Sequence, residues 1–211
     1  MLKVYEINTN ILKEEEIKEC ANSDKYSHIT NETILKQQIA KDKLLKFIMQ
    51  EEGIVSAIEK DKNGKPYFVN SNIMFNITHS DNFVLIAVSD EEVGIDIQKI
   101  ERIDELKLDK LSRRIYNDND YNYFNVDENV TFIQIWTIKE AFLKCIGIGL
   151  INNFHDIYID YMKHEIFYGK YNFYKYITFL RNMNLISIVS NQITKSASKN
   201  MRINIIEYKE Q

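Results

Sequence analysis

Hydrophobic and polar positions follow two different periods along this chain, and each period predicts one kind of element. Alternation of apolar and polar residues, or a short apolar run, predicts strands at 2–7, 73–77, 83–88, 93–98, 156–161, 165–168, 173–179, 185–190 and 202–208. Apolar residues at helical spacing predict helices at 12–21, 33–50, 104–116 and 130–146. The run 83–88 is apolar throughout, which is typical of a strand covered on both faces.

The order of these elements predicts the fold class. Helices followed by antiparallel strands occur twice, which favours an α+β protein of two similar halves. We expect these halves at 1–99 and 100–211, each a helix plus antiparallel strands, so that one chain forms a pseudo-dimer. Two similar halves within one chain also favour a monomer.

Composition and charge narrow the classes of function. The chain has 211 residues, of which 45% are apolar and 27% charged, as in an ordinary globular protein. A net charge of −4 with dispersed lysines indicates neither a nucleic-acid partner nor a membrane partner. Without a signal peptide or a long apolar run, we expect a cytoplasmic location. Cys20 and Cys145 form no disulfide framework and no metal spacing, and Cys145 is expected to be a buried, inert thiol.

The strand at 93–98 carries the first candidate chemistry. Its alternation directs Val93, Ile95 and Ile97 to one face, and Gly94, Asp96 and Gln98 to the other. An acid and an amide two residues apart are natural oxygen ligands for a hard cation, and a glycine beside them would let a ligand approach the backbone. The alternative is an ordinary solvated strand face.

The helix at 130–146 carries a second set of candidate functional residues. Glu140 and Lys144 form an i,i+4 pair outside the apolar stripe, which is either an ordinary surface ion pair or part of a site. Lys139 falls inside the apolar stripe, so it either extends to the edge or meets an anion, from the protein or from a ligand. A third candidate is the polar end of the strand near Thr78 and His79, which could hold a phosphate or form a solvated turn.

Four stretches carry a joint pattern: GKP at 64–66, FNITHS at 75–80, GIDIQ at 94–98 and WTIKEAFLK at 136–144. In this order and spacing they resemble the 4′-phosphopantetheinyl transferase superfamily, in its larger, surfactin-synthetase-activating type. The resemblance implies an enzyme that transfers the 4′-phosphopantetheine arm from coenzyme A to a serine of an apo carrier protein, with Mg²⁺, and releases 3′,5′-ADP. Such a phosphoryl transfer requires positioning and charge neutralisation above all.

The resemblance also implies roles for single residues. Asp96 and Glu140 would bind the metal, and Glu140 would take the serine proton, directly or through water. Lys144 would stabilise or protonate the leaving phosphate. This chain has Gln98 where the family commonly has glutamate, and we expect Gln98 to ligate through its carbonyl oxygen or to orient a metal-bound water. A neutral amide oxygen is a poorer Mg²⁺ ligand than a carboxylate, so the enzyme should need more free Mg²⁺ than a version with glutamate.

The remaining implied contacts concern coenzyme A. Thr78 and His79 match positions that contact its phosphates, Lys65 matches a further cofactor contact, and Lys139 fits the motif with a role of electrostatic support. Basic residues that the family uses for the 3′-phosphate are not matched, because the expected arginine aligns near Gln37. Neighbouring lysines are substitutes or a solvated helix face: Lys36, Lys41 and Lys43.

Residues 100–124 would then meet the acidic carrier protein, unless their apolar side chains only pack the second half. Within enzymes, the alternative is a transferase restricted to the acyl carrier protein of fatty-acid synthesis. In another class, the chain would be a non-catalytic module that binds coenzyme A or a carrier protein.

Overall fold

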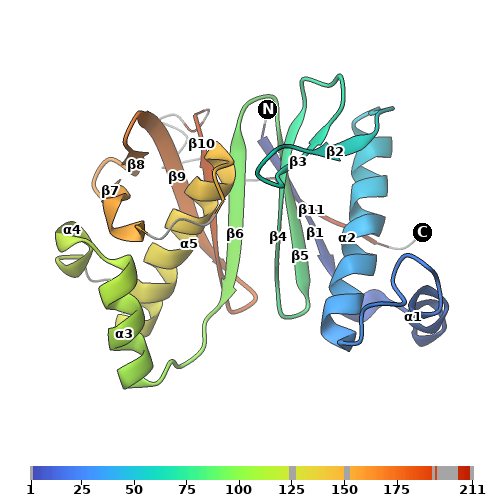
Figure 1. Ribbon diagram of the computed structural model, residues 1–211, viewed down its shortest axis with the longest axis horizontal. Helices are drawn as coiled ribbons and strands as arrows, with labels where there is room; N and C mark the ends of the chain where they lie inside the picture. Colours follow the sequence, from blue (N-terminus) through green and yellow to red (C-terminus); the bar gives the residue numbers. More distant parts are fainter. Residues whose placement is uncertain (1, 124–126, 150–152, 192, 194–203, 210–211) are drawn as a thin grey trace.

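The computed structural model describes residues 2–123, 127–149, 153–191, 193 and 204–209. They form two larger β-sheets with helices against them, and a separate two-stranded hairpin (Figure 1). The helices are α1 (Glu14–Ala21), α2 (Glu32–Glu51), α3 (Glu105–Ile115), α4 (Asp118–Tyr121) and α5 (Glu128–Ile146), with 3-10 turns η1 (Thr9–Ile11) and η2 (Phe154–Asp156). Among the described residues, no helix is both long enough and apolar enough to cross a bilayer. The mixture of helices and mainly antiparallel sheets confirms the α+β class.

The first sheet joins strands from both ends of the chain. Its order is β11-β1-β5-β4, with β1 at Leu2–Asn8, β4 at Met74–Ser80, β5 at Phe83–Ser89 and β11 at Asn204–Glu207. β5 is antiparallel to both of its neighbours, whereas β11 runs parallel to β1. Helix α2 covers one face of this sheet, where Leu44 and Ile48 share a core with Val84 and Ile86.

The second sheet has the order β6-β10-β9-β8-β7, and all its described pairs are antiparallel. Its strands are β6 (Val93–Lys99), β7 (Tyr158–Asp160), β8 (Glu165–Tyr168), β9 (Tyr171–Arg181) and β10 (Asn184–Ser190). Helix α5 packs on it, with Ile138 and Phe142 fully buried in the shared core. Asp127 caps the start of α5 by accepting from Val130 N, and Gly147 ends it with φ of 68°.

The two sheets meet along β4 and β6, which lie near the centre of the molecule in Figure 1. On the side of β6 away from β10, two backbone N–H groups are satisfied by side chains of β4. Ile95 N donates to Asn76 Oδ1 over 3.0 Å, and Ile97 N donates to Thr78 Oγ1 over 3.3 Å. Because both side chains are buried, the edge of β6 is closed without a strand ladder.

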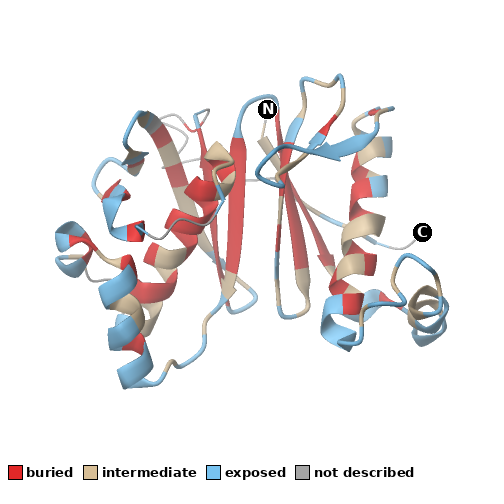
Figure 2. Ribbon diagram, viewed as in Figure 1, coloured by how far each residue is buried: buried red, intermediate tan, exposed pale blue. Residues whose placement is uncertain are grey.

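A third core fills the space between the sheets. Val4 and Leu85 from the first sheet meet Ile95 and Ile188 from the second, and all four are fully buried. The buried colour of the central strands in Figure 2 reflects this core. The alternation of β6 therefore works as expected, because its isoleucines enter a core and its other face remains for Asp96.

The predicted helices are confirmed to within two residues at each end, and most strands are similarly close. Strand β4 is longer than predicted and includes Thr78 and His79, which therefore lie within a strand and not in a turn. The sequence prediction missed the short hairpin of β2 (Ile58–Lys60) and β3 (Pro66–Phe68) around the predicted turn. Residues 202 and 203 of the last predicted strand lie outside the described residues.

Sheet membership does not follow the expected division at residue 99. β6 precedes that position but pairs with β10 of the second sheet, and β11 near the end of the chain completes the first sheet. Each sheet still has its own long helix. The pseudo-dimer relation and the assignment of separate roles to 1–99 and 100–211 stay predictions.

Candidate active site

Three elements bring the candidate residues together. Asp96 lies in the middle of β6, Glu140 and Lys144 lie one turn apart on α5, and Thr78 lies on β4 beside β6. The polar face of β6 is turned toward α5, so the strand face and the helix face that the sequence singled out oppose each other.

Gly94 allows α5 to lie directly on β6. A Cβ atom at this position would lie 1.9 Å from the carbonyl oxygen of Ala141 and 2.4 Å from the backbone nitrogen of Cys145. We expected this glycine to let a ligand approach the strand. Instead the backbone of the helix occupies that space, and the glycine sets the separation between Asp96 and the side chains of α5.

Asp96 has three side-chain partners. Oδ1 accepts from Lys144 Nζ over 2.6 Å and from Thr78 Oγ1 over 3.2 Å, and Oδ2 accepts from Gln98 Nε2 over 3.3 Å. Lys144 Nζ also donates to Thr78 Oγ1 over 3.2 Å. Thr78 is thus buried and bonded to protein groups, and its expected contact with a phosphate stays a prediction.

Glu140 is in a different state from Asp96. Its side chain is 9% exposed, and Oε1 is buried with no hydrogen-bond partner among the described residues. Burial and, second, the charge of Asp96 raise the pKa of Glu140 to about 7, against the opposing effect of Lys144. A carboxylate oxygen left open beside a second carboxylate is an arrangement that a cation would stabilise.

The donor set fits a hard divalent cation. Carboxylate oxygens of Asp96 and Glu140 are the ligand type that Mg²⁺ prefers, and Mg²⁺ keeps several waters, so few protein ligands suffice. Gln98 directs its amide Nε2 to Asp96 Oδ2, so ligation through its carbonyl oxygen stays a prediction. Among the residues that the structure describes, no third acidic, histidine or cysteine side chain joins them. A bound phosphate group would have to complete the coordination.

His79, on β4, is the titratable group next to Thr78. His79 is exposed, and its pKa is lowered by partial desolvation and by the charges of Lys144 and Lys41, against the opposing charge of Asp96. The lowered pKa leaves the imidazole neutral near pH 7, so the cations that act on it are Lys144, on α5, and Lys41, on α2. Two ammonium groups and a neutral hydrogen-bonding imidazole form a setting for an anion.

A cavity of about 320 Å³ opens beside this cluster. It is lined by residues of the 63–66 turn, of β4 and of α5, including Lys65, Asn76, Glu140 and Lys144. Lys65 Nζ donates to the carbonyl oxygen of Cys145 over 2.6 Å, near the end of α5, and burial lowers the pKa of Lys65. Lys65 therefore borders the cavity while it bonds a C-terminal carbonyl of the helix.

Lys139 lies elsewhere and has a protein partner. Its fully buried ammonium donates to Asp120 Oδ2 over 2.5 Å and to the carbonyl oxygens of Ile115 and Phe154 over 2.8 Å and 3.1 Å. The anion suspected from the sequence is thus an aspartate on α4. With three protein acceptors, this ammonium has no donor directed to the cavity, which corrects the expected cofactor contact.

The unmatched 3′-phosphate position also has a structural explanation. Gln37 is buried, and its Nε2 donates to the carbonyl oxygen of Asp81 over 2.9 Å. Lys36 pairs with Glu32 on α2 over 2.5 Å. Sequence reasoning also missed Asn76, whose signal was a polar residue at an inward position of a strand.

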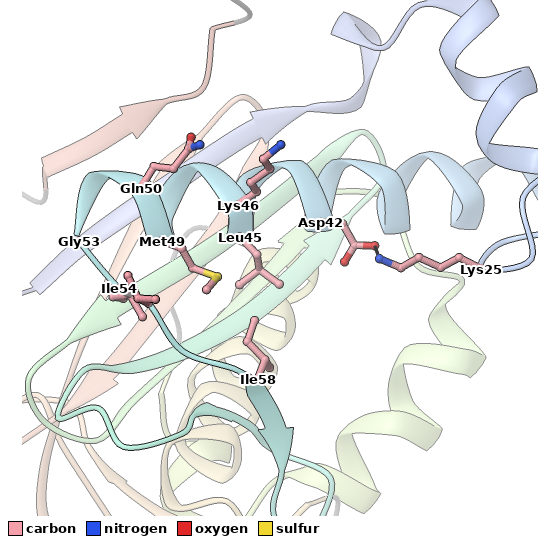
Figure 3. A pocket seen from close by; sticks show the side chains of 10 residues that line it. Lys25, Asp42, Leu45, Lys46, Met49, Gln50, Gly53, Ile54 and Ile58 are labelled. Carbon is pink, nitrogen blue, oxygen red and sulfur yellow. Dashed lines mark ion pairs between the residues drawn. The ribbon is translucent and has the colours of Figure 1, made fainter.

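A second cavity, of about 490 Å³, lies along α2 and the segment 53–58. Figure 3 shows Leu45, Met49 and Ile54 at its apolar side and the Lys25–Asp42 ion pair at its rim. None of its lining residues belongs to the cluster around Asp96. The volume of a cavity therefore does not identify the candidate active site. The site is identified by the charged and titratable side chains that come together around Asp96.

Comparison with known proteins supports the resemblance. Residues 92–190 match the model of the 4′-phosphopantetheinyl transferase superfamily. The chain is 37% identical over 105 residues to the 4′-phosphopantetheinyl transferase Gsp of Aneurinibacillus migulanus, covering 48% of this chain and 42% of that protein. It is 33% identical over 97 residues to the 4′-phosphopantetheinyl transferase Psf-1 of Bacillus pumilus, covering 44% and 40%. The predicted resemblance, including the larger type, is confirmed over this region.

These matches concern part of each protein, since the chain spans less than half the length of the curated relatives that it matches. Among solved structures, a holo-(acyl-carrier-protein) synthase from Bacillus anthracis in complex with CoA (3′,5′-ADP) is similar, with 24% sequence identity and a TM-score of 0.39. That match covers 46% of this chain and 92% of the other.

Proposed function

We propose that this chain, whose residues 92–190 match the 4′-phosphopantetheinyl transferase superfamily, transfers the 4′-phosphopantetheine arm of coenzyme A to a serine of an apo carrier protein. The observation that carries the proposal is the opposition of two carboxylates, Asp96 and Glu140, with Lys144 bonded to one of them and a cavity beside them. This is the set of groups that a phosphoryl transfer requires.

Glu140 is suited to move a proton. Its Oε1 is buried without a hydrogen-bond partner among the described residues, and without metal its pKa is raised to about 7, so this oxygen could take the proton of the attacking serine, directly or through water. Lys144 would hold the phosphate that leaves, and Asp96 and Gln98 would share a Mg²⁺ ion with Glu140. When bound, Mg²⁺ would supply neutralisation of the pyrophosphate charge.

The cationic side of the cluster would hold coenzyme A. The cavity beside Glu140 and Lys144 accepts an extended ligand, and Lys65 lies along its wall. The charge of Lys41, on α2, acts on His79, whose neutral imidazole can donate a hydrogen bond to a phosphate. We infer that this side binds the phosphates of coenzyme A, and that Lys41 rather than Lys36 replaces the expected arginine.

The carrier protein would meet the region 100–124. On α3, Leu106 is 82% exposed and Arg114 is exposed, whereas Leu108 is buried in the core. Leu106 and Arg114 therefore remain for a partner, and Leu108 packs the second half. Phe124, at the end of this region, lies outside the described residues. A division between coenzyme A binding in 1–99 and carrier contact in 100–211 is part of this proposal, as are a monomer and a cytoplasmic location.

A transfer assay tests the proposal. The protein, coenzyme A and Mg²⁺ are incubated with apo carrier proteins from fatty-acid, peptide and polyketide synthesis, and each carrier is examined by intact mass spectrometry. We expect a product with the added mass of one phosphopantetheine arm. Modification of the fatty-acid carrier alone would favour the restricted transferase.

Two variants make the assay specific. Glu140→Gln should abolish transfer and leave the fold intact by circular dichroism, because the amide cannot take the serine proton. Glu15→Gln removes one carboxylate from an exposed position on α1, outside the proposed carrier contact, and should keep the wild-type rate. Unchanged transfer by Glu140→Gln would refute the role of Glu140, and coenzyme A binding without transfer to any carrier would favour a binding module.

A further inference from the structure

Lys144 lies on the carboxylate that the proposed function assigns to the metal. Its Nζ is 2.6 Å from Asp96 Oδ1 and 3.3 Å from the carbonyl oxygen of Ile95, and within the described part of the chain the carboxylate that it pairs with is Asp96 and not Glu140. Of the two carboxylates, one is thus paired with a cation of the protein, and the other has an open buried oxygen. A cluster ready for a divalent cation would have both carboxylates free.

We propose that Lys144 is a built-in counter-cation of Asp96, which must leave this carboxylate before a divalent cation binds there. An anionic ligand at the cavity would attract Lys144 and release Asp96, so that metal and pyrophosphate load together. This inference rests on the proposed function, because it concerns the same site. It adds the order in which Lys144 leaves and the metal binds, and the coupling between binding of the metal and binding of the pyrophosphate.

The physical basis is competition between two cations for one oxygen. An ammonium group at 2.6 Å from Oδ1 occupies the position that a metal ion would take, and two cations at one carboxylate repel each other. The pair is sheltered, since the Asp96 side chain is only 4% exposed, and screening by solvent is therefore weak.

Lys144 is also able to move. Its side chain is 29% exposed, it lines the cavity together with Glu140 and Lys65, and four methylene groups let the ammonium turn from Asp96 toward that space. A pyrophosphate there offers several charged oxygens in exchange for one carboxylate. Because coupling between two ligands is reciprocal, the metal should raise the affinity for the anion by the same factor.

Binding of Mn²⁺, followed by the loss of its free electron paramagnetic resonance signal, tests the inference without nucleotide or carrier protein. Wild type is compared with Lys144→Met, which keeps the length of the side chain and removes its charge. A charge-assisted hydrogen bond is the contact removed, so we expect the Mn²⁺ affinity of the nucleotide-free protein to rise about tenfold.

Two control variants separate competition from a change in net charge. Lys144→Arg retains the cation and should keep the wild-type Mn²⁺ affinity to within about threefold. Lys99→Met removes a lysine that pairs with Asp81 on the exposed surface and should change the affinity by less than about twofold. In a second arm, coenzyme A should raise the Mn²⁺ affinity more in wild type than in Lys144→Met.

The outcomes are distinct for the two proposals. A Mn²⁺ affinity that is unchanged or lower in Lys144→Met, or no Mn²⁺ binding in either protein, overturns the role of Lys144. Absence of coenzyme A binding and of transfer refutes the proposed function, whereas the nucleotide-free measurement still reports whether Lys144 competes for Asp96.

Discussion

Replacing Gly94 by alanine should separate the two elements that carry the site. The added Cβ would lie 1.9 Å from the carbonyl oxygen of Ala141, and ordinary contact begins at 3.4 Å, so α5 must retreat from β6 by about 1.5 Å. The atoms that clash belong to the backbone of a helix. Rotation of a side chain cannot relieve the overlap, and the whole helix or strand has to shift.

The magnitude follows from the displacement. Overpacking of a tight core costs about 3 kcal/mol at the upper end of the usual range, and we expect at least this loss in the free energy of unfolding. Asp96 lies on β6, and Glu140 and Lys144 lie on α5, so the shift changes the separation of the proposed catalytic groups. A misplacement of about 1 Å can lower a rate about 100-fold, and we expect a fall in kcat of that order.

Urea unfolding monitored by circular dichroism gives the loss of stability, and the carrier-protein assay gives kcat under conditions where the variant is folded. Gly169→Ala is the matched control. This glycine lies in the turn between β8 and β9, has φ of 55° and has no atom within 4 Å of an added Cβ. Its substitution should cost only about 1 kcal/mol of backbone strain and leave kcat unchanged. Wild-type stability and kcat for Gly94→Ala would refute the close approach as the reason for this glycine.

Three further predictions concern separate features. Burial raises the pKa of Cys145 to about 12, so a thiol reagent at pH 8 should leave Cys145 unmodified in the folded protein. In denaturant the same reagent should modify both Cys145 and Cys20. Rapid labelling of Cys145 in the folded protein would contradict its burial. Lys139→Met leaves Asp120 buried without its cation and should lower the free energy of unfolding by about 3–5 kcal/mol, with partial recovery when Asp120→Asn is added. Urea titration measures both variants, and equal stability of wild type and Lys139→Met would show that the pair is dispensable. Gln98→Glu should lower the Mg²⁺ concentration for half-maximal transfer, and an unchanged value would place Gln98 outside the metal site.

Several features of the fold could be read from local pattern because they depend on neighbours along the chain. The alternation at 93–98 placed the isoleucines of β6 in a core, and the i,i+4 spacing placed Glu140 and Lys144 on one side of α5. The turn at 63–66 was visible, but the short strands on either side of it were not, since their three residues each carry too little periodicity.

Long-range features were less accessible to the sequence. The pairing of β6 with β10 joins segments far apart along the chain, and the pairing of β1 with β11 joins segments from its two ends. The sequence of a strand does not identify the strand with which it pairs, because the hydrogen bonds between strands are made by backbone groups that are common to nearly all residue types. We expected a boundary at residue 99 from the order of the elements along the chain. In the folded protein, however, a strand joins the sheet whose free edge lies beside it.

The sequence by itself determined the α+β class and the family that its motifs resemble, and it singled out Asp96, Glu140 and Lys144 as candidates, because periodicity and motif spacing are local properties of the chain. Only the tertiary structure decided the partners of each charged group. It pairs Lys139 with Asp120 in the core, places Lys144 on Asp96, and leaves an oxygen of Glu140 open. The physical reason is that a charge is stabilised by whatever packing brings within a few ångströms of it, and that neighbour is set by the fold rather than by position along the chain.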